Sequence, residues 1–171
     1  MIEEICYDGK QHIQGVTQMD LRKAKLGDVE EILNLVNKYA EAGLMLPRSR
    51  NTLYEHIRDF VVVAKDKKIV GTGALHIVWG DLAEIRALAV APGFTKQGIG
   101  KKMVEYFLQE AKELGIPKVF ALTYQPDFFA KCGFALVNKE NMPQKVWKEC
   151  INCPKFPNCD EICMEINIDL A

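Results

Sequence analysis

The 171-residue sequence lacks a long apolar run, since no stretch approaches the roughly 18 consecutive apolar residues that a membrane-spanning helix needs. It also lacks an excess of charge of either sign, because 22 basic and 23 acidic side chains leave a formal net charge of −1. Such a chain has no general attraction for nucleic acid or for an anionic membrane surface. We therefore expect neither of these partners, and any anion must be held by local groups.

A secretory signal is missing as well. The N-terminus carries Glu3, Glu4 and Asp8 where a signal peptide would need basic residues and an apolar core. The expected location is the cytoplasm, where the six cysteines would be reduced thiols or metal ligands rather than disulfides. Internal repeats and low-complexity linkers are also absent, so a chain of this length predicts one globular domain.

The sequence does contain alternating strand and helix patterns from residue 19 onward. Residues 1–18 show no clear periodicity and are predicted to be a weakly attached extension, so the domain is expected to span residues 19–171. Helices are predicted within 27–43, 51–60, 99–115 and 126–133, strands within 19–25, 82–90, 118–124, 134–139 and 162–170, and a two-stranded hairpin within 60–80. This order predicts an α/β fold with a mixed sheet.

The stretch "LAVAPGFTKQGIGKKMV", residues 88–104, joins a predicted strand to a predicted helix through Gly98 and Gly100. A glycine-rich turn at a helix N-terminus presents backbone N–H groups and the positive end of the helix dipole, which suit phosphate oxygens. The spacing matches neither the GxxxxGK[ST] loop nor the three-glycine dinucleotide fingerprint. On these residues alone, a tight turn without a ligand is an equal alternative.

The same stretch resembles the acetyl-CoA-binding motif of the GNAT superfamily of N-acetyltransferases, in which a strand of pattern L-x-V-x-P leads into [QR]-x-x-G-x-[GA]. The first loop residue of that pattern is Thr95 here, while "FFAKCGF", residues 128–134, resembles the family's aromatic helix. The resemblance implies a mixed central sheet with splayed strands, helices on both faces, and acetyl-CoA as co-substrate. The cofactor-binding residues that it implies are Leu88, Ala89, Val90, Lys96, Gln97, Gly98, Ile99, Gly100, Lys101 and Phe129.

Four further stretches are similar to the short, single-domain amino-acid acetyltransferases of the N-acetylglutamate synthase type. They are residues 46–62, 73–90, 121–129 and 142–162. This resemblance implies acetyl transfer to the α-amine of L-glutamate, a small-molecule acceptor, as the first step of arginine biosynthesis. The protein could also form a homodimer.

Amine acetylation needs a base for the ammonium, a donor for the developing oxyanion and an acid for the leaving thiolate. Glu84 and Arg86 alternate with small apolar residues, so their side chains should share one face of the strand. Glu84 is the predicted base, acting through a water, and the alternative is that it only pairs with Arg86. By resemblance, the Leu88 N–H is the oxyanion donor. The tyrosine usual in the aromatic helix is Phe129 here, so Tyr124 is the predicted acid, or else a packed aromatic.

The two carboxylates of glutamate suit planar guanidinium groups. Arg48 and Arg86 are the predicted pair that binds them, whereas Arg50 is expected to be solvated. His76 is predicted to orient the substrate or relay a proton, and the alternative is a hydrogen-bonded structural histidine.

Four cysteines lie in a loop over residues 150–163, with Pro154 and Pro157 between them: Cys150, Cys153, Cys159 and Cys163. Four thiols in a chain without an export signal fit a tetrahedral structural zinc site. Cys163 could also face the core of the closing strand, which would leave three ligands. The alternative is reduced buried thiols that behave as small hydrophobic side chains.

Two other functions stay open at this point. The same fold could acetylate another amine, such as a protein N-terminus or a polyamine. It could also be a non-catalytic acetyl-CoA-binding module that regulates a partner, because the usual tyrosine is absent at position 129.

Overall fold

The structure, a computed structural model, describes residues 11–12, 19–143, 150–153 and 155–171. Its strands are β1 (Gln11–His12), β2 (Met19–Lys23), β3 (Phe60–Lys65), β4 (Lys68–Trp79), β5 (Leu82–Val90), β6 (Lys118–Thr123), β7 (Ala135–Val137) and β8 (Ile162–Asn167). Its α-helices are α1 (Val29–Glu41), α2 (Arg50–Glu55), α3 (Ile99–Glu113) and α4 (Pro126–Lys131). Short 3₁₀ turns connect them: η1 (Leu26–Asp28), η2 (Ile57–Asp59), η3 (Pro92–Phe94), η4 (Lys139–Asn141) and η6 (Cys150–Asn152).

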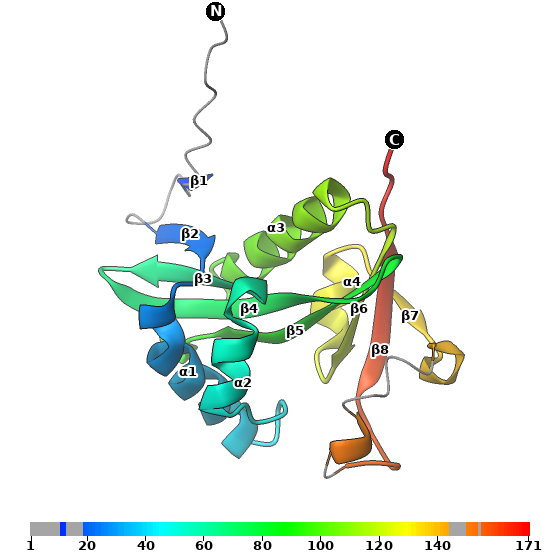
Figure 1. The fold of residues 1–171 in the computed structure, drawn as a ribbon, viewed down its shortest axis with the longest axis horizontal. Coiled ribbons are helices and arrows are strands. Elements are labelled where there is room, and N and C mark those ends of the chain that lie inside the picture. Colours follow the sequence, from blue (N-terminus) through cyan, green and yellow to red (C-terminus); the bar gives the residue numbers. More distant parts are fainter. Residues whose placement is uncertain (1–10, 13–18, 144–149, 154) are drawn as a thin grey trace, which may run out of the picture.

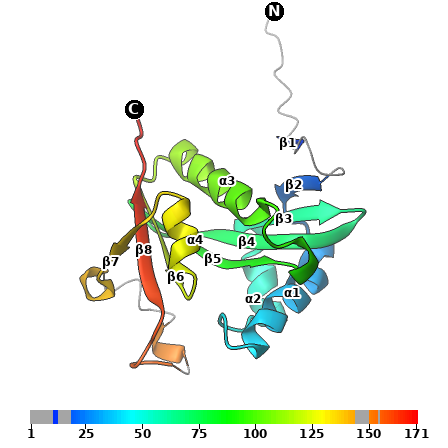
Figure 2. The same ribbon diagram turned by 180° about the vertical axis from the view of Figure 1, so that it is seen from behind.

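The described strands form one eight-stranded sheet in the order β1-β2-β3-β4-β5-β6-β8-β7. Neighbouring strands are antiparallel except β5 and β6, which run parallel. Helices α1 and α2 lie against one face of the sheet and α3 against the other (Figure 1). The view from behind shows α4 beside β6 and β8 (Figure 2). The predicted mixed α/β fold with helices on both faces is confirmed.

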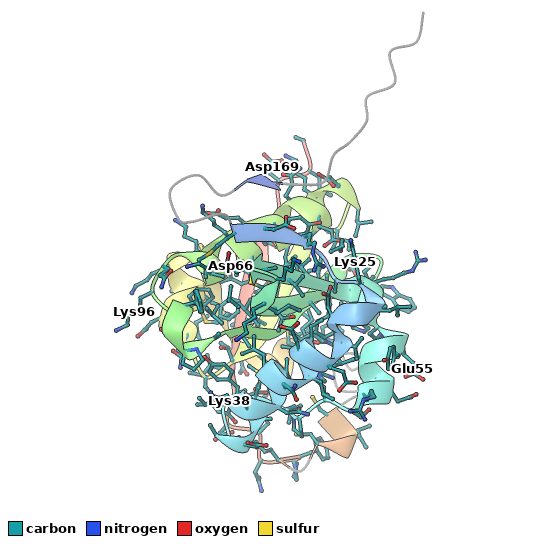
Figure 3. All side chains as sticks on the ribbon, turned by 90° about the vertical axis from the view of Figure 1, so that its left-hand side faces the viewer. Lys25, Lys38, Glu55, Asp66, Lys96 and Asp169 are labelled. Carbon is teal, nitrogen blue, oxygen red and sulfur yellow. The ribbon has the colours of Figure 1, made fainter. Side chains whose placement is uncertain are left out.

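The two long helices each bury one apolar face. In α3 the buried positions recur at helical spacing and pack against β4 and β5, where Gly71 and Gly73 leave room for them. In α1 the buried residues form a second core with α2 on the opposite face. Charged side chains such as Glu55 and Lys96 point outward (Figure 3). No helix in the described part of the chain is both long and apolar enough to cross a lipid bilayer.

Strand β5 separates from both of its neighbours near its middle. On the β6 side, the described pairing comprises only Ala83 and Glu84, and the two strands diverge beyond them. On the β4 side, the pairing jumps from Arg86 to Ala89, so Ala87 and the next residue form a bulge opposite Gly73. Ala87 has a φ of 53°, a left-handed conformation that is uncommon outside glycine. This bulge and divergence are the splayed strands that the resemblance implied.

Two elements differ from the sequence prediction. The helix predicted over residues 51–60 stops at Glu55 and tightens into the 3₁₀ turn η2, because Phe60 has to leave it and pair with Ala74 as the first residue of β3. Strand β1, which pairs with β2, lies in the stretch predicted to be a weakly attached extension, for which no strand was predicted. Two residues are too few to show a period-two alternation, so the sequence gives no signal for it.

Candidate functional site

Two cavities open where β5 leaves β6. The first, of about 480 Å³, is lined by the loop before α2, by β5 and by the cysteine-rich segment, and we call it the Arg48 cavity. The second, of about 550 Å³, is lined by the bulged half of β5, the loop before α3 and α4, and we call it the Gly98 cavity. Both cavities are bordered by the same residues near the bulge: Met45, Arg86, Ala87, Leu122 and Glu161.

The loop that enters α3 is held in shape by its own side chains. The Thr95 hydroxyl donates to the Pro92 carbonyl at 3.1 Å, and the Gln97 amide donates to the Gly93 carbonyl at 3.2 Å. Gly98 precedes the helix with a φ of 80°, which L side chains rarely adopt. A Cβ atom on Gly98 would meet nothing within 4 Å, so glycine is required there by the backbone conformation, and the space beside it is open.

Gly100 leaves room for a neighbouring helix. A Cβ atom at this position would lie 3.2 Å from two ring atoms of Phe128, so its absence lets α4 approach α3. Phe128 packs edge-to-face on Phe129, with ring centroids 5.2 Å apart, and Phe129 packs on Phe134 in the same way. The sequence predicted a cofactor contact for Phe129 alone. Phe128 also lines the Gly98 cavity, and the adjacent aromatic in "FFAKCGF" was the available signal.

Nine of the ten residues predicted to bind a cofactor line the Gly98 cavity: Leu88, Ala89, Val90, Lys96, Gly98, Ile99, Gly100, Lys101 and Phe129. Gln97 is absent from the described lining of either cavity, and its amide is directed at Gly93 instead. Tyr39 of α1 lines the same cavity, and its hydroxyl donates to the Val90 carbonyl at the end of β5. Tyr39 was not predicted as a site residue, because its position within the helix predicted over residues 27–43 suggests only a packed aromatic.

Tyr124, the predicted acid, follows β6 and lines the Gly98 cavity. Its hydroxyl donates to an Asp160 carboxylate oxygen at 2.5 Å and accepts from the Lys155 ammonium. Burial raises the pKa of Tyr124, and the hydrogen bond to Asp160 raises it further, while Lys155 acts in the opposite direction. The phenol therefore keeps its proton at neutral pH, as an acid has to do before it donates.

Within the Arg48 cavity, the main chain of Arg48 is fixed by Asn37 of α1. The Asn37 side chain accepts from the Arg48 N–H at 2.9 Å and donates to the Arg48 carbonyl at 3.0 Å. On β5, one oxygen of Glu84 accepts from Arg86 Nε at 3.0 Å and from its terminal nitrogen at 2.7 Å. Both side chains are mostly buried, so the pairing that the sequence left as an alternative is present in this cavity.

Two predicted residues lie elsewhere. Arg50 is exposed and makes a bidentate ion pair with Glu30, at 2.6 and 2.9 Å, as expected of a surface arginine. His76 lies outside the described lining of both cavities. Its Nδ1 is 2.9 Å from an Asp59 oxygen, which is the hydrogen-bonded structural arrangement left open above.

Glu161 was missed by the sequence reasoning, although it borders both cavities. It precedes β8 in a loop whose charges look solvated in the sequence, and only the fold brings it opposite β5. Burial raises its pKa, and the negative charge of Glu84 raises it further. A carboxyl group with a raised pKa beside a second carboxylate is characteristic of catalytic sites.

The predicted zinc site is not supported. Cys150, Cys153 and Cys159 line the Arg48 cavity, whereas Cys163 is buried on β8, as the alternative proposed. Within the described residues, no three of these sulfurs lie within 4.8 Å of one another. Burial, with Glu84 adding to it, raises the pKa of Cys150 to about 11, and burial raises that of Cys163 to about 11. In the absence of a metal ion, the Cys150 and Cys163 thiols are therefore neutral at physiological pH.

Comparison with known proteins decides the family. Residues 29–134 match the family model described as acetyltransferase (GNAT) family. The chain belongs to the GNAT family. It is 42% identical to an uncharacterised N-acetyltransferase of Chlorobaculum tepidum over 84% of this chain and 93% of that protein. It is 36% identical to an amino-acid acetyltransferase of Mycobacterium tuberculosis over 88% of this chain and 81% of that protein.

Solved structures of GNAT proteins agree with this assignment. A Mycobacterium tuberculosis protein in complex with CoA superposes with a TM-score of 0.76 at 33% identity, over 87% of this chain and 99% of that one. N-acetylglutamate synthase of Neisseria gonorrhoeae, complexed with CoA and N-acetyl-glutamate, gives a TM-score of 0.80 at 27% identity, over 88% of this chain and 35% of that one. This GNAT protein is therefore an acetyl-CoA-dependent N-acetyltransferase.

The loop geometry yields a prediction about cofactor affinity. Gly98→Val should weaken acetyl-CoA binding more than tenfold, about 1.4 kcal/mol, because valine disfavours the left-handed conformation that shapes the loop. Isothermal titration calorimetry measures this directly. Gly93→Val is the matched control, since Gly93 has open space around it, no positive φ and no place in the lining of the Gly98 cavity. Unchanged affinity in a folded Gly98→Val protein would contradict the assignment.

The raised pKa of Glu161 yields a prediction about stability. Its folded-state pKa lies above the unfolded value of about 4.3, so its contribution to the free energy of unfolding is full below that pH and is lost as the pH rises through the folded pKa. Glu161→Gln should therefore lose less stability than the wild type between acidic and neutral pH, as measured by urea unfolding at a series of pH values. Glu140→Gln, an exposed carboxylate in the same cavity, should follow the wild type. Parallel curves for all three proteins would refute the prediction.

Proposed function

We propose that this protein transfers the acetyl group of acetyl-CoA to the α-amine of L-glutamate, as in the first step of arginine biosynthesis, within a catalytic domain spanning residues 19–171. The observation that carries the proposal is that Arg48 and Arg86 line one cavity, which meets the Gly98 cavity at the bulge of β5. Two guanidinium groups match the two carboxylates of glutamate. The amino-acid acetyltransferases among the relatives, and the synthase structure that holds N-acetyl-glutamate, support the same acceptor.

The cofactor would occupy the Gly98 cavity. The pyrophosphate would lie over the N-terminus of α3, where backbone N–H groups and the helix dipole favour negative charge. The pantetheine chain would run along Leu88–Val90, on the side of β5 that β6 has left. This path brings the thioester to the bulge, where the left-handed Ala87 turns the following peptide, so that the Leu88 N–H would serve as the oxyanion donor.

The acceptor amine would enter from the Arg48 cavity. A substrate carboxylate on Arg86 has to share that guanidinium with Glu84, which loosens the existing ion pair. Glu84 would then remove the ammonium proton through a water, and the free amine would attack the thioester carbonyl. When the tetrahedral intermediate collapses, the CoA thiolate would leave and take its proton from Tyr124, whose raised pKa keeps it protonated until that step. The nitrogen would give up its second proton as it becomes the amide, and this proton would restore Tyr124.

The second candidate function is acetylation of an amine other than glutamate. It is favoured because carboxylates as well as arginines line the Arg48 cavity: Glu84, Glu140 and Glu161. A cationic acceptor such as a polyamine would suit these groups. Release of free CoA thiol over a panel of amino acids, polyamines and peptides distinguishes the two acceptors. A non-catalytic module would release none.

Loss of the base should act on turnover rather than on cofactor binding. Glu84→Gln should lower kcat about a hundredfold, remove the acidic limb of the pH–rate profile and leave acetyl-CoA affinity nearly unchanged. Steady-state kinetics over a pH series measures this, with Glu140→Gln as the control that removes another carboxylate of the same cavity. Turnover near the wild-type value would show that Glu84 is not the general base, and Glu161 would be the next residue to test in that role.

The arginine pair should set the acceptor preference. The wild type should favour glutamate over glutamine by about 2–3 kcal/mol in kcat/KM, since a guanidinium built for a carboxylate is left incompletely paired by an amide. Arg48→Lys should raise the KM for glutamate and spare that for acetyl-CoA, because an ammonium cannot reproduce the bidentate contact. Arg50→Lys is the matched control, two residues away and paired with Glu30 on the surface. A preference for glutamine, or an effect on acetyl-CoA alone, would disprove the arginine pair.

A further inference from the structure

We propose that His56, Asp59 and His76 form a binding site for a divalent transition-metal ion of the zinc class, outside both cavities. Each residue offers one ligand atom, and the three ligand atoms lie within 4.8 Å of one another. Among the described residues, this is the group of three or more histidine, cysteine or acidic side chains that meets this distance. None of the three lines the described part of either cavity.

The distances suit a tetrahedral ion. Bonds of about 2.0–2.1 Å to nitrogen and oxygen place neighbouring tetrahedral ligands about 3.3 Å apart. In the structure, Asp59 Oδ2 lies 2.9 Å from Nδ1 of His76 and 3.6 Å from Nδ1 of His56, so the two separations bracket that value. The two imidazole rings are nearly perpendicular, with centroids 5.4 Å apart, so their edges can converge on a common point beside the carboxylate.

The fold supplies the three ligands from two rigid elements. His56 follows the last residue of α2 and Asp59 ends the 3₁₀ turn η2, so they are three residues apart on one tight turn. His76 projects from the second half of β4, beyond the end of the pairing with β3 at Ala74, where the strand is paired with β5 through Glu84. Because the turn that replaces the predicted end of α2 brings Asp59 to β4, the ligand set depends on this departure from regular helix.

Access and ligand chemistry indicate which ion would bind. The side chains are 39%, 29% and 23% exposed for His56, Asp59 and His76, so an ion can enter and keep water as its fourth ligand. Two imidazoles and one carboxylate are typical ligands of zinc and its neighbours, whereas magnesium and calcium prefer all-oxygen sites. The bound ion would tie the α2–β3 connection to the sheet.

Cobalt(II) is the probe, because its absorption separates this site from the cysteine-rich loop. The reduced protein, titrated with cobalt(II), should bind one ion that gives visible d–d bands without the near-ultraviolet charge-transfer bands of a thiolate ligand. His76→Ala and Asp59→Asn should each weaken this binding at least tenfold. His56→Ala, which removes the most exposed ligand, repeats the test in case either of the other variants fails to fold.

Two controls remove comparable groups from elsewhere. Glu55→Gln neutralises an exposed carboxylate at the end of α2, and His12→Ala removes the third histidine of the sequence. Both should bind cobalt(II) as the wild type does. The absence of saturable binding, spectra with thiolate charge transfer alone, or unchanged binding in folded His76→Ala and His56→Ala would each overturn the site. A purely hydrogen-bonded cluster of these three residues would give the first of these results.

Discussion

The bulge in β5 is the constraint on which the rest of the site depends. A regular strand would keep β5 paired with β6 along its whole length and leave no opening in the sheet. Instead the pairing with β6 covers Ala83 and Glu84, and Ala87 takes a left-handed conformation that redirects the chain. The two cavities lie on either side of this point and share Arg86 and Glu161 at their border. Local backbone strain of this kind is commonly found where a fold has to position reacting groups.

Much of the fold could be predicted from the sequence because its signals are local. Apolar spacing predicted α1 and α3, and β-branched runs predicted the β3–β4 hairpin. The glycine pair predicted the turn that enters α3. A Cβ atom on Gly100 would crowd Phe128, which is a contact between helices distant in the sequence and has no local signal. Pairings across the chain have no local signature, which is why Asn37 and Glu161 were not predicted. The cysteine spacing suggested one metal site, but strand β8 turns Cys163 into the core and separates it from the others.

The net charge of this protein is only −1, yet several charged side chains line one partly buried cleft. Glu84 is neutralised by Arg86 at the floor of the Arg48 cavity, and the nearby Glu161 has a raised pKa because its charge would be buried beside another carboxylate. The same surroundings keep the Cys150 thiol protonated, with a pKa of about 11. Arg86 therefore lies near both Glu84 and Glu161. An anion that binds to Arg86 would change the pKa of these two carboxyl groups.

Helix α1 contacts both halves of the cleft through two side chains on its last turns. Asn37 fixes the main chain of Arg48, and Tyr39, two residues later, holds the carbonyl of Val90. One helix thus connects the loop that lines the Arg48 cavity with the strand that lines the Gly98 cavity. Val29, Ile32 and Val36 bury the same helix in the second core, so both contacts are made from one packed element.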